Sequence, residues 1–272
     1  MLSAIIRTQR ARISSHLGAT MDDVAAVGST RTAALVKDRS SPVVINLEPT
    51  VCKEQHFTQL MEMAEEFIKH EPQSQALGLS ITETRPLLEH LISVSLRAPY
   101  SILIQDADTE KPLGFRLVSI SSRDAEVNAS RPPIPLNTQG IRTFWNSIVR
   151  LQNEFWKVYH DVNLVLRNEI TYVAPSYQRI GVTDRLLHYG LDFDRLREDG
   201  FEGIVAESTS ASAHSVLARN GYTCAARLDH KIYRTLDGKP YPLTRVPKDD
   251  LRLYFKDFRE YDGIPHTSYE WH

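Results

Sequence analysis

Apolar residues recur with a helical period in three long stretches of the chain, and each stretch predicts an amphipathic helix. The first covers residues 54–70 and ends before Pro72, because a proline disfavours helical geometry in the residue before it. The second covers residues 84–94 and places Pro86 in its first turn, where a proline is tolerated. The third, residues 141–159, keeps large apolar side chains on one face.

Shorter apolar runs bounded by turn residues predict strands. Residues 100–105 and 113–121 flank a polar turn, so they predict an antiparallel hairpin. Residues 128–140 hold three prolines and predict a loop. The other runs that predict strands are residues 43–47, 169–173, 201–207 and 224–233.

Strands and helices alternate in the second half of the chain. Helices are predicted at residues 182–197 and 211–219, and Gly221 follows the latter as a left-handed C-cap. This alternation predicts an α/β domain with a partly parallel sheet, and the hairpin adds antiparallel strands, so the sheet is mixed and flanked by helices. We place this domain at residues 43–272 and interpret residues 1–42 as a poorly ordered N-terminal extension.

The composition is that of a globular protein in water, with 42% hydrophobic and 24% charged residues. A formal net charge of -2 gives no overall basic field for nucleic acid or an anionic membrane, and no apolar run reaches the roughly 18 residues that cross a bilayer. The two cysteines, Cys52 and Cys224, have no companions at metal-ligand spacing, so we expect neither a disulfide framework nor a metal site. We therefore expect a cytoplasmic protein without nucleic-acid or membrane partners.

Residues 1–21 allow a second interpretation of the location. They contain Arg7, Arg10 and Arg12 with several serines and no acidic residue, a composition that resembles a mitochondrial transit peptide. A solvated tail has the same composition, and the sequence leaves both open.

The segment most informative about chemistry is residues 170–187. An apolar strand turns at Pro175 into a short loop that opens an amphipathic helix. Main-chain N–H groups at a helix start are unpaired and lie at the positive end of the helix dipole, which suits a phosphate or pyrophosphate. Gly181 in this loop allows a close approach to an anion. No Gly-Lys-Ser/Thr follows, which excludes a nucleotide P-loop.

The run Gln178-Arg-Ile-Gly181-Val-Thr183 resembles the Q/R-x-x-G-x-G/A acetyl-CoA loop of the GNAT superfamily in all but its last position. The stretch from Val216 to Tyr222 is similar to the later helix and the closing Gly-aromatic pair of that family. The resemblance implies a GNAT fold with acetyl-CoA as cosubstrate. It implies cofactor contacts at Tyr172, Val173, Gln178, Arg179, Ile180, Gly181, Val182 and Thr183.

Thr183 departs from the family pattern, which has Gly or Ala at this position. Its side chain could crowd the pyrophosphate, donate its hydroxyl to a phosphate oxygen, or point away.

In the first half, His70-Glu71-Pro72 followed by Leu77-Gly-Leu79 resembles the Asp-Glu-Pro-Leu region of insect-type arylalkylamine N-acetyltransferases. With the helix at 141–159, this resemblance covers about residues 43–233. In that group the glutamate is the general base that acts on the amine through water, which implies this role for Glu71. The alternative is a solvated glutamate at a helix end.

Three further residues are catalytic candidates. Glu169 opens the strand before the cofactor loop, where some GNAT enzymes place a carboxylate base. The paired serines of the arylalkylamine group fall near Ser210 and Ser212, although counting back from Gly221 puts Ala213 where the second serine stands. The alternative for Ser210 is helix capping.

The resemblances predict an acetyl-CoA-dependent N-acetyltransferase that acts on a small primary amine, an arylalkylamine, by direct transfer with a carboxylate base and no metal. A main-chain N–H near Val173 would stabilise the developing oxyanion. Two alternatives remain: a non-catalytic GNAT-like module that binds CoA or a partner, and a protein N-acetyltransferase, which would have an open groove. The sequence leaves open which amine is acetylated and whether Glu71 or Glu169 is the base.

Overall fold

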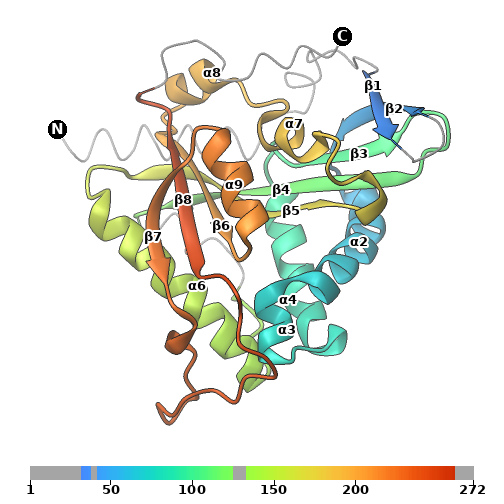
Figure 1. Ribbon diagram of the computed structural model, residues 1–272. Helices are drawn as coiled ribbons and strands as arrows, with labels where there is room; N and C mark the ends of the chain where they lie inside the picture. The colour runs from blue at the N-terminus through green and yellow to red at the C-terminus, as the bar shows by residue number, and fades with distance from the viewer. Residues whose placement is uncertain (1–31, 38–41, 125–132, 261–272) are drawn as a thin grey trace.

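The computed structural model describes residues 32–37, 42–124 and 133–260. Within these ranges the strands form an eight-stranded sheet in the order β1-β2-β3-β4-β5-β6-β8-β7 (Figure 1). Neighbouring strands are antiparallel except β5 and β6, which are parallel, so the predicted mixed, partly parallel sheet is confirmed. The strands are β1 Thr32–Lys37, β2 Pro42–Val51, β3 Ile102–Asp106, β4 Pro112–Ser122, β5 Leu164–Val173, β6 Gly203–Ser208, β7 Thr223–Leu228 and β8 Leu251–Asp257.

Helices cover both faces of the sheet (Figure 1). Buried apolar clusters join α2, α4 and α6 to one face and α7, α8 and α9 to the other. The helices are α2 Phe57–His70, α3 Pro72–Leu77, α4 Ile81–Ser95, α6 Gln139–Val158, α7 Val182–His188, α8 Phe193–Glu198 and α9 Ala211–Arg219, with 3₁₀ turns η1 Glu54–His56, η2 Pro175–Tyr177 and η3 His230–Ile232.

Strand β5 leaves its parallel neighbour halfway along its length. It pairs with β4 from end to end, but with β6 only at Leu166, Arg167 and Asn168. The β4–β5 register shifts directly after this point, so that Glu169 has no residue opposite it in β4. A bulge of this kind bends a strand and raises its local twist. The second half of β5 therefore diverges from β6 and leaves one edge of the strand open, as Figure 1 shows.

Helix α4 begins earlier than its apolar period predicts. Ser80 caps it in a capping box: its hydroxyl accepts from the main-chain N–H of Glu83 at 3.2 Å, and the Glu83 carboxylate accepts from the N–H of Ser80 at 3.0 Å. The placement of Pro86 in the first turn is thus wrong, because the helix starts at Ile81 and Pro86 lies in its second turn. Proline has no N–H, so the helix lacks one main-chain hydrogen bond there.

The single helix predicted at residues 182–197 is wrong, because the chain turns between α7 and α8. Gly190 has a φ of 70°, and the Asp192 carboxylate starts α8 by accepting from two main-chain N–H groups at 3.0 and 3.1 Å. The turn leaves carbonyl groups without helical partners, and the fully buried Arg116 of β4 takes them. Its guanidinium donates to the carbonyls of Tyr100, Leu186, Leu187 and Tyr189 at 2.7 to 2.9 Å.

Other boundaries also differ from the predictions. Strand β1 lies inside the expected N-terminal extension and pairs with β2. The expected strand at 224–233 ends at Leu228 and is followed by η3, and β8 had not been predicted. The C-cap at Gly221 is confirmed by its φ of 80°. Residues 1–21 and the first part of the expected loop, 128–132, lie outside the described residues.

Over the ranges that the structure describes, no helix combines the length and the apolar character needed to span a membrane.

Candidate active site

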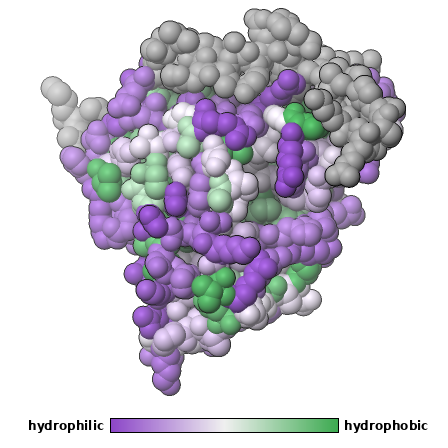
Figure 2. Space-filling view, in the orientation of Figure 1, coloured by the Kyte–Doolittle hydropathy of each residue, from purple (hydrophilic) through white to green (hydrophobic). Residues whose placement is uncertain are grey.

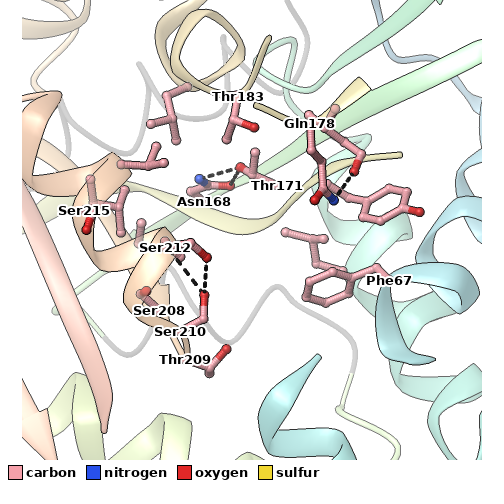
Figure 3. Close-up of a pocket in the computed structure, with 18 of the residues that line it drawn as sticks. Phe67, Asn168, Thr171, Gln178, Thr183, Ser208, Thr209, Ser210, Ser212 and Ser215 are labelled. Atoms are coloured by element: carbon pink, nitrogen blue, oxygen red, sulfur yellow. Dashed lines mark hydrogen bonds between the residues drawn. The ribbon is translucent and has the colours of Figure 1, made fainter. Parts of the chain in front are cut away.

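A large cleft of about 790 Å³ opens where β5 and β6 diverge. One wall is the second half of β5 with the loop that leads into α7, and the other is the end of β6 with the start of α9 (Figure 3). Its inner end is bordered by Phe67 and Glu71, from the end of α2 and the turn that follows it. Figure 2 shows a mostly hydrophilic surface with a hollow near the middle of this face.

The loop from Gln178 to Thr183 is held in a left-handed turn against β5. The side-chain amide of Gln178 donates to the carbonyl of Val173 at 2.8 Å (Figure 3). Arg179 and Gly181 have φ values of 64° and 84°, a region that glycine adopts without strain. A Cβ added at Gly181 would meet no atom within 4 Å. The backbone angle therefore favours glycine here, and the space beside it is open.

Six of the eight predicted cofactor residues line the cleft: Tyr172, Val173, Gln178, Arg179, Gly181 and Thr183. The side chains of Ile180 and Val182 instead pack into an apolar cluster, where Val182 is buried. Only their main-chain groups remain for a ligand. The orientation in which Thr183 points away from the cleft is not observed, because this residue lines it (Figure 3).

The open edge of β5 presents main-chain groups to the cleft. The N–H of Ala174 points towards β4 and donates to the carbonyl of Leu113 in that strand at 2.8 Å. Successive residues of a strand point their N–H and C=O groups to opposite sides, so those of Val173 point away from β4. The bond from Gln178 to the carbonyl of Val173 agrees with this direction. The N–H of Val173 therefore faces the open side, as the oxyanion prediction requires.

Hydroxyl groups form the opposite wall (Figure 3). Ser210 accepts from the main-chain N–H of Ala213 at 3.3 Å and caps α9, so the capping interpretation of Ser210 is confirmed. Its hydroxyl also lies 3.1 Å from that of Ser212, and both serines line the cleft. Behind them the Ser208 hydroxyl lies 3.0 Å from Nδ1 of the buried His214. A proton relay through the two predicted serines stays a prediction.

At its inner end the cleft adjoins a small chamber of about 100 Å³, which we call the inner chamber. Its walls are mostly apolar and aromatic, from α2, α4 and α6, and include Phe144 and Trp145. The residues that line both the cleft and the inner chamber are Phe67, Glu71, Glu169, Ile170, Glu207 and Thr209. A third cavity of about 370 Å³ borders the chamber from the α4–α6 side, at Trp145, Arg167 and Glu169.

Glu71 lies where the cleft and the inner chamber meet. The residue is 5% exposed, so the alternative of a solvated glutamate at a helix end is wrong. It is the N-cap of α3: its two oxygens accept from the main-chain N–H groups of Gln73 at 3.0 Å and Ser74 at 2.5 Å. Pro72 follows at the first helical position, where no N–H is needed. The nearby Tyr233 stays neutral, because burial, and to a lesser extent the Glu71 carboxylate, raises the pKa of its hydroxyl.

The bulge in β5 directs Glu169 into a buried charge cluster. The Ser119 hydroxyl donates to one oxygen of Glu169 at 2.5 Å, and Arg167 lies 3.4 Å from the other. Arg167 also pairs with Glu207 of β6 at 3.0 Å, and Gln152 of α6 donates to the same Glu207 oxygen at 3.2 Å. The structure thus brings the two predicted base candidates, Glu71 and Glu169, to one cavity.

Arg167 and Glu207 were not predicted as site residues. Arg167 and Glu169 are charged residues two positions apart in a mostly apolar stretch, so they lie on one face of the strand. This spacing is the signal that could have identified Arg167. No comparable local signal marks Glu207.

Among the residues that the structure describes, no group of three or more His, Cys, Asp or Glu side chains could hold a metal ion.

No protein-family model matches the sequence, and no curated protein matches it. Solved structures do match. An arylalkylamine N-acetyltransferase 7, putative in name, from the yellow fever mosquito Aedes aegypti has a TM-score of 0.68 at 14% identity, over 85% of this chain and 94% of that one. Arylalkylamine N-acetyltransferase 2 of Aedes aegypti has a TM-score of 0.64 at 16% identity, over 78% of this chain and 99% of that one.

A third similar structure is the polyamine N-acetyltransferase of Drosophila melanogaster, an enzyme that forms N-acetylagmatine. It has a TM-score of 0.59 at 13% identity, over 78% of this chain and 99% of that one. Similarity at this level of identity concerns the fold, and it confirms the predicted fold class. The chain has the GNAT fold of arylalkylamine and polyamine N-acetyltransferases.

Proposed function

We propose that the protein is an acetyl-CoA-dependent N-acetyltransferase that acts on a small primary amine. The observation that carries this proposal is that two cavities adjoin each other and share lining residues. The cleft offers an open strand edge and a glycine-containing loop, and it meets an apolar chamber at the carboxylates of Glu71, Glu169 and Glu207. Such a junction can bring a thioester from one side together with an amine from the other.

The cleft has the groups that acetyl-CoA needs. The open edge of β5 can pair with the amide groups of the pantetheine arm as a further strand would. The main-chain N–H groups between Gln178 and Thr183 would hold the pyrophosphate, and the Thr183 hydroxyl can add a donor. The oxygen of the thioester carbonyl would lie against the N–H of Val173, which would stabilise the negative charge that develops there.

The inner chamber suits a small amine. The carboxylate of Glu71 attracts an ammonium group, and aromatic side chains such as Phe144 and Trp145 suit an apolar body. A volume of about 100 Å³ favours a small molecule over a peptide, which argues against a protein N-acetyltransferase.

In the proposed reaction the ammonium first loses a proton to Glu71 through a water molecule. The nitrogen lone pair then attacks the thioester carbonyl, a C–N bond forms, and the C–S bond breaks. The CoA thiolate leaves and takes up the second proton of the nitrogen, which gives the amide and CoASH, and Glu71 then releases its proton to water. Glu71 is favoured over Glu169 because main-chain amides hold its two oxygens and leave each a second lone pair. A proton on Glu169 would instead weaken a buried ion pair with Arg167.

The test measures thiol release from acetyl-CoA with a panel of amines that includes tyramine, tryptamine, serotonin and agmatine. We expect turnover with at least one of them and formation of the N-acetyl product. Binding of acetyl-CoA without turnover of any amine would contradict the enzymatic proposal and favour a non-catalytic CoA-binding module.

A further inference from the structure

The inner chamber contains a cation of its own. Arg167 lines the chamber but not the cleft, and its side chain is 6% exposed. Its guanidinium lies between Glu169 and Glu207 and 5.6 Å from the ring centroid of Trp145, a cation–π distance. Arg167 therefore occupies a place where a substrate cation could otherwise bind between two carboxylates and an aromatic ring.

This guanidinium keeps its charge. Burial alone would lower the pKa of Arg167, but the carboxylates of Glu169 and Glu207 outweigh burial and raise the pKa above its ordinary value. The three groups are fixed further by Ser119 on Glu169 and by Gln152 on Glu207. The site is thus filled, charged and hydrogen-bonded before any substrate arrives.

Only some of the carboxylates that line the inner chamber are free to bind a cationic substrate. Of the three around the chamber, Glu169 and Glu207 are paired with Arg167, whereas within the described part of the chain Glu71 is held by main-chain N–H groups and by no cation. A second ammonium on the same substrate would meet apolar walls, the uncharged side chains of Gln73 and Ser74, or the guanidinium itself, and none of these supplies a negative charge. Burial of an unpaired charge is strongly unfavourable, and a like charge adds to it.

We propose that Arg167 determines the substrate class of the proposed acetyltransferase: it admits amines with one ammonium group and an apolar body, and it excludes diamines and polyamines. This inference rests on the proposed function. It separates two classes that the similar structures leave open, because they include enzymes named for arylalkylamines and for polyamines.

The experiment uses pentylamine and 1,5-diaminopentane, which share one carbon chain and differ in the second ammonium. We expect the wild-type protein to prefer pentylamine by roughly 100-fold in kcat/KM, since a buried group without a partner rejects a ligand strongly. In Arg167→Met the two carboxylates lose their cation and the distal ammonium can take its place. The preference should then move towards the diamine by at least about tenfold. Equal use of both amines by the wild-type protein would overturn the proposal.

Arg167→Lys is the matched control, because it keeps a cation at the same position and should keep the preference for pentylamine. A folded Arg167→Met protein with an unchanged preference would also overturn the proposal. If Arg167→Met does not fold, because it leaves two buried carboxylates uncompensated, Arg167→Met with Glu169→Gln removes one of them and keeps Glu207 for the distal ammonium. The same shift towards the diamine is expected in this double variant.

Calorimetry of both amines in the presence of CoA separates this inference from the proposed function. If the wild-type protein acetylates neither these two amines nor any amine of the panel above, but binds pentylamine more tightly than the diamine, the proposed activity fails and the role of Arg167 stands. If it acetylates and binds both amines equally well, the activity stands and the role of Arg167 fails.

Discussion

The two halves of β5 are continuous in sequence but differ in the strands that pair with them. The first half, through Asn168, lies between β4 and β6 and has its main-chain groups paired on both sides. The second half, from Glu169 to Val173, pairs with β4 alone and lines the cleft. Both halves carry buried apolar side chains. The first half therefore contributes stability, and the second also leaves main-chain groups available for a ligand.

The largest effect on activity should come from a substitution beside the open half of β5. Glu71→Gln keeps the shape of the side chain but removes the proposed proton acceptor, so kcat should fall by roughly 10²- to 10⁴-fold while the affinity for acetyl-CoA changes little. Glu66→Gln is the matched control, because Glu66 lies on α2 as an exposed residue paired with Lys69 and His70. Steady-state kinetics with the best amine measure both. Full activity of Glu71→Gln together with loss of activity in Glu169→Gln would assign the base to β5.

A second test truncates one side chain in each half of β5. Leu166 is fully buried against the helices of one face, so Leu166→Ala should lower the free energy of unfolding by about 2–5 kcal/mol. Thr171→Ala removes a half-buried hydroxyl bonded to the Asn168 side chain, with an expected loss of about 0.5–1.5 kcal/mol. Denaturant titration measures both variants. Equal losses would contradict the expectation that the Thr171 side chain, in the open half, contributes less to stability than Leu166.

The third test concerns the loop that borders the open half. Gly181 has a φ of 84°, so Gly181→Val introduces backbone strain of about 1–3 kcal/mol and places a side chain in the open space of the cleft. We expect the affinity for acetyl-CoA to fall by at least tenfold in calorimetry. Gly200→Val is the control, since Gly200 has a φ of 92° with equal space around it but does not line the cleft. Gly200→Val should lower the stability of the protein and leave its affinity for acetyl-CoA unchanged. If Gly200→Val loses as much affinity as Gly181→Val, the loss is due to backbone strain and not to the position of Gly181 in the cleft.

The loop at residues 178–183 could be located from the sequence because its signal is contiguous, whereas its role as a cofactor loop stays a prediction. The turn at Pro175, the glycine at 181 and the following apolar helix lie within one short stretch. The strands and helices with a clear period were predicted for the same reason, with errors at their ends. The six-residue α3 is too short to show a period, and the alternation of Leu251, Leu253 and Phe255 that forms β8 was present but overlooked after a proline-rich segment.

The inner chamber could not be predicted in the same way, because its parts meet only in the folded chain. Arg167 reaches Glu207 because β5 and β6 run parallel, with Arg167 opposite Val205. Trp145 joins them from α6 across the face of the sheet. No local spacing relates these three residues. Glu71, by contrast, was proposed from a resemblance, and its capping of α3 explains physically why a glutamate before a proline stays buried there.

The contacts of Arg116 have a consequence for how the loop region opens and closes. Its guanidinium is fully buried, and its acceptors are carbonyls at the end of α7, in the turn after it, and at Tyr100. A local opening of α7 would leave this buried charge with the carbonyl of Tyr100 alone, which is strongly unfavourable. The segment that carries the loop should therefore exchange its amide hydrogens only together with β4, as one cooperative unit, and not as a fraying surface turn.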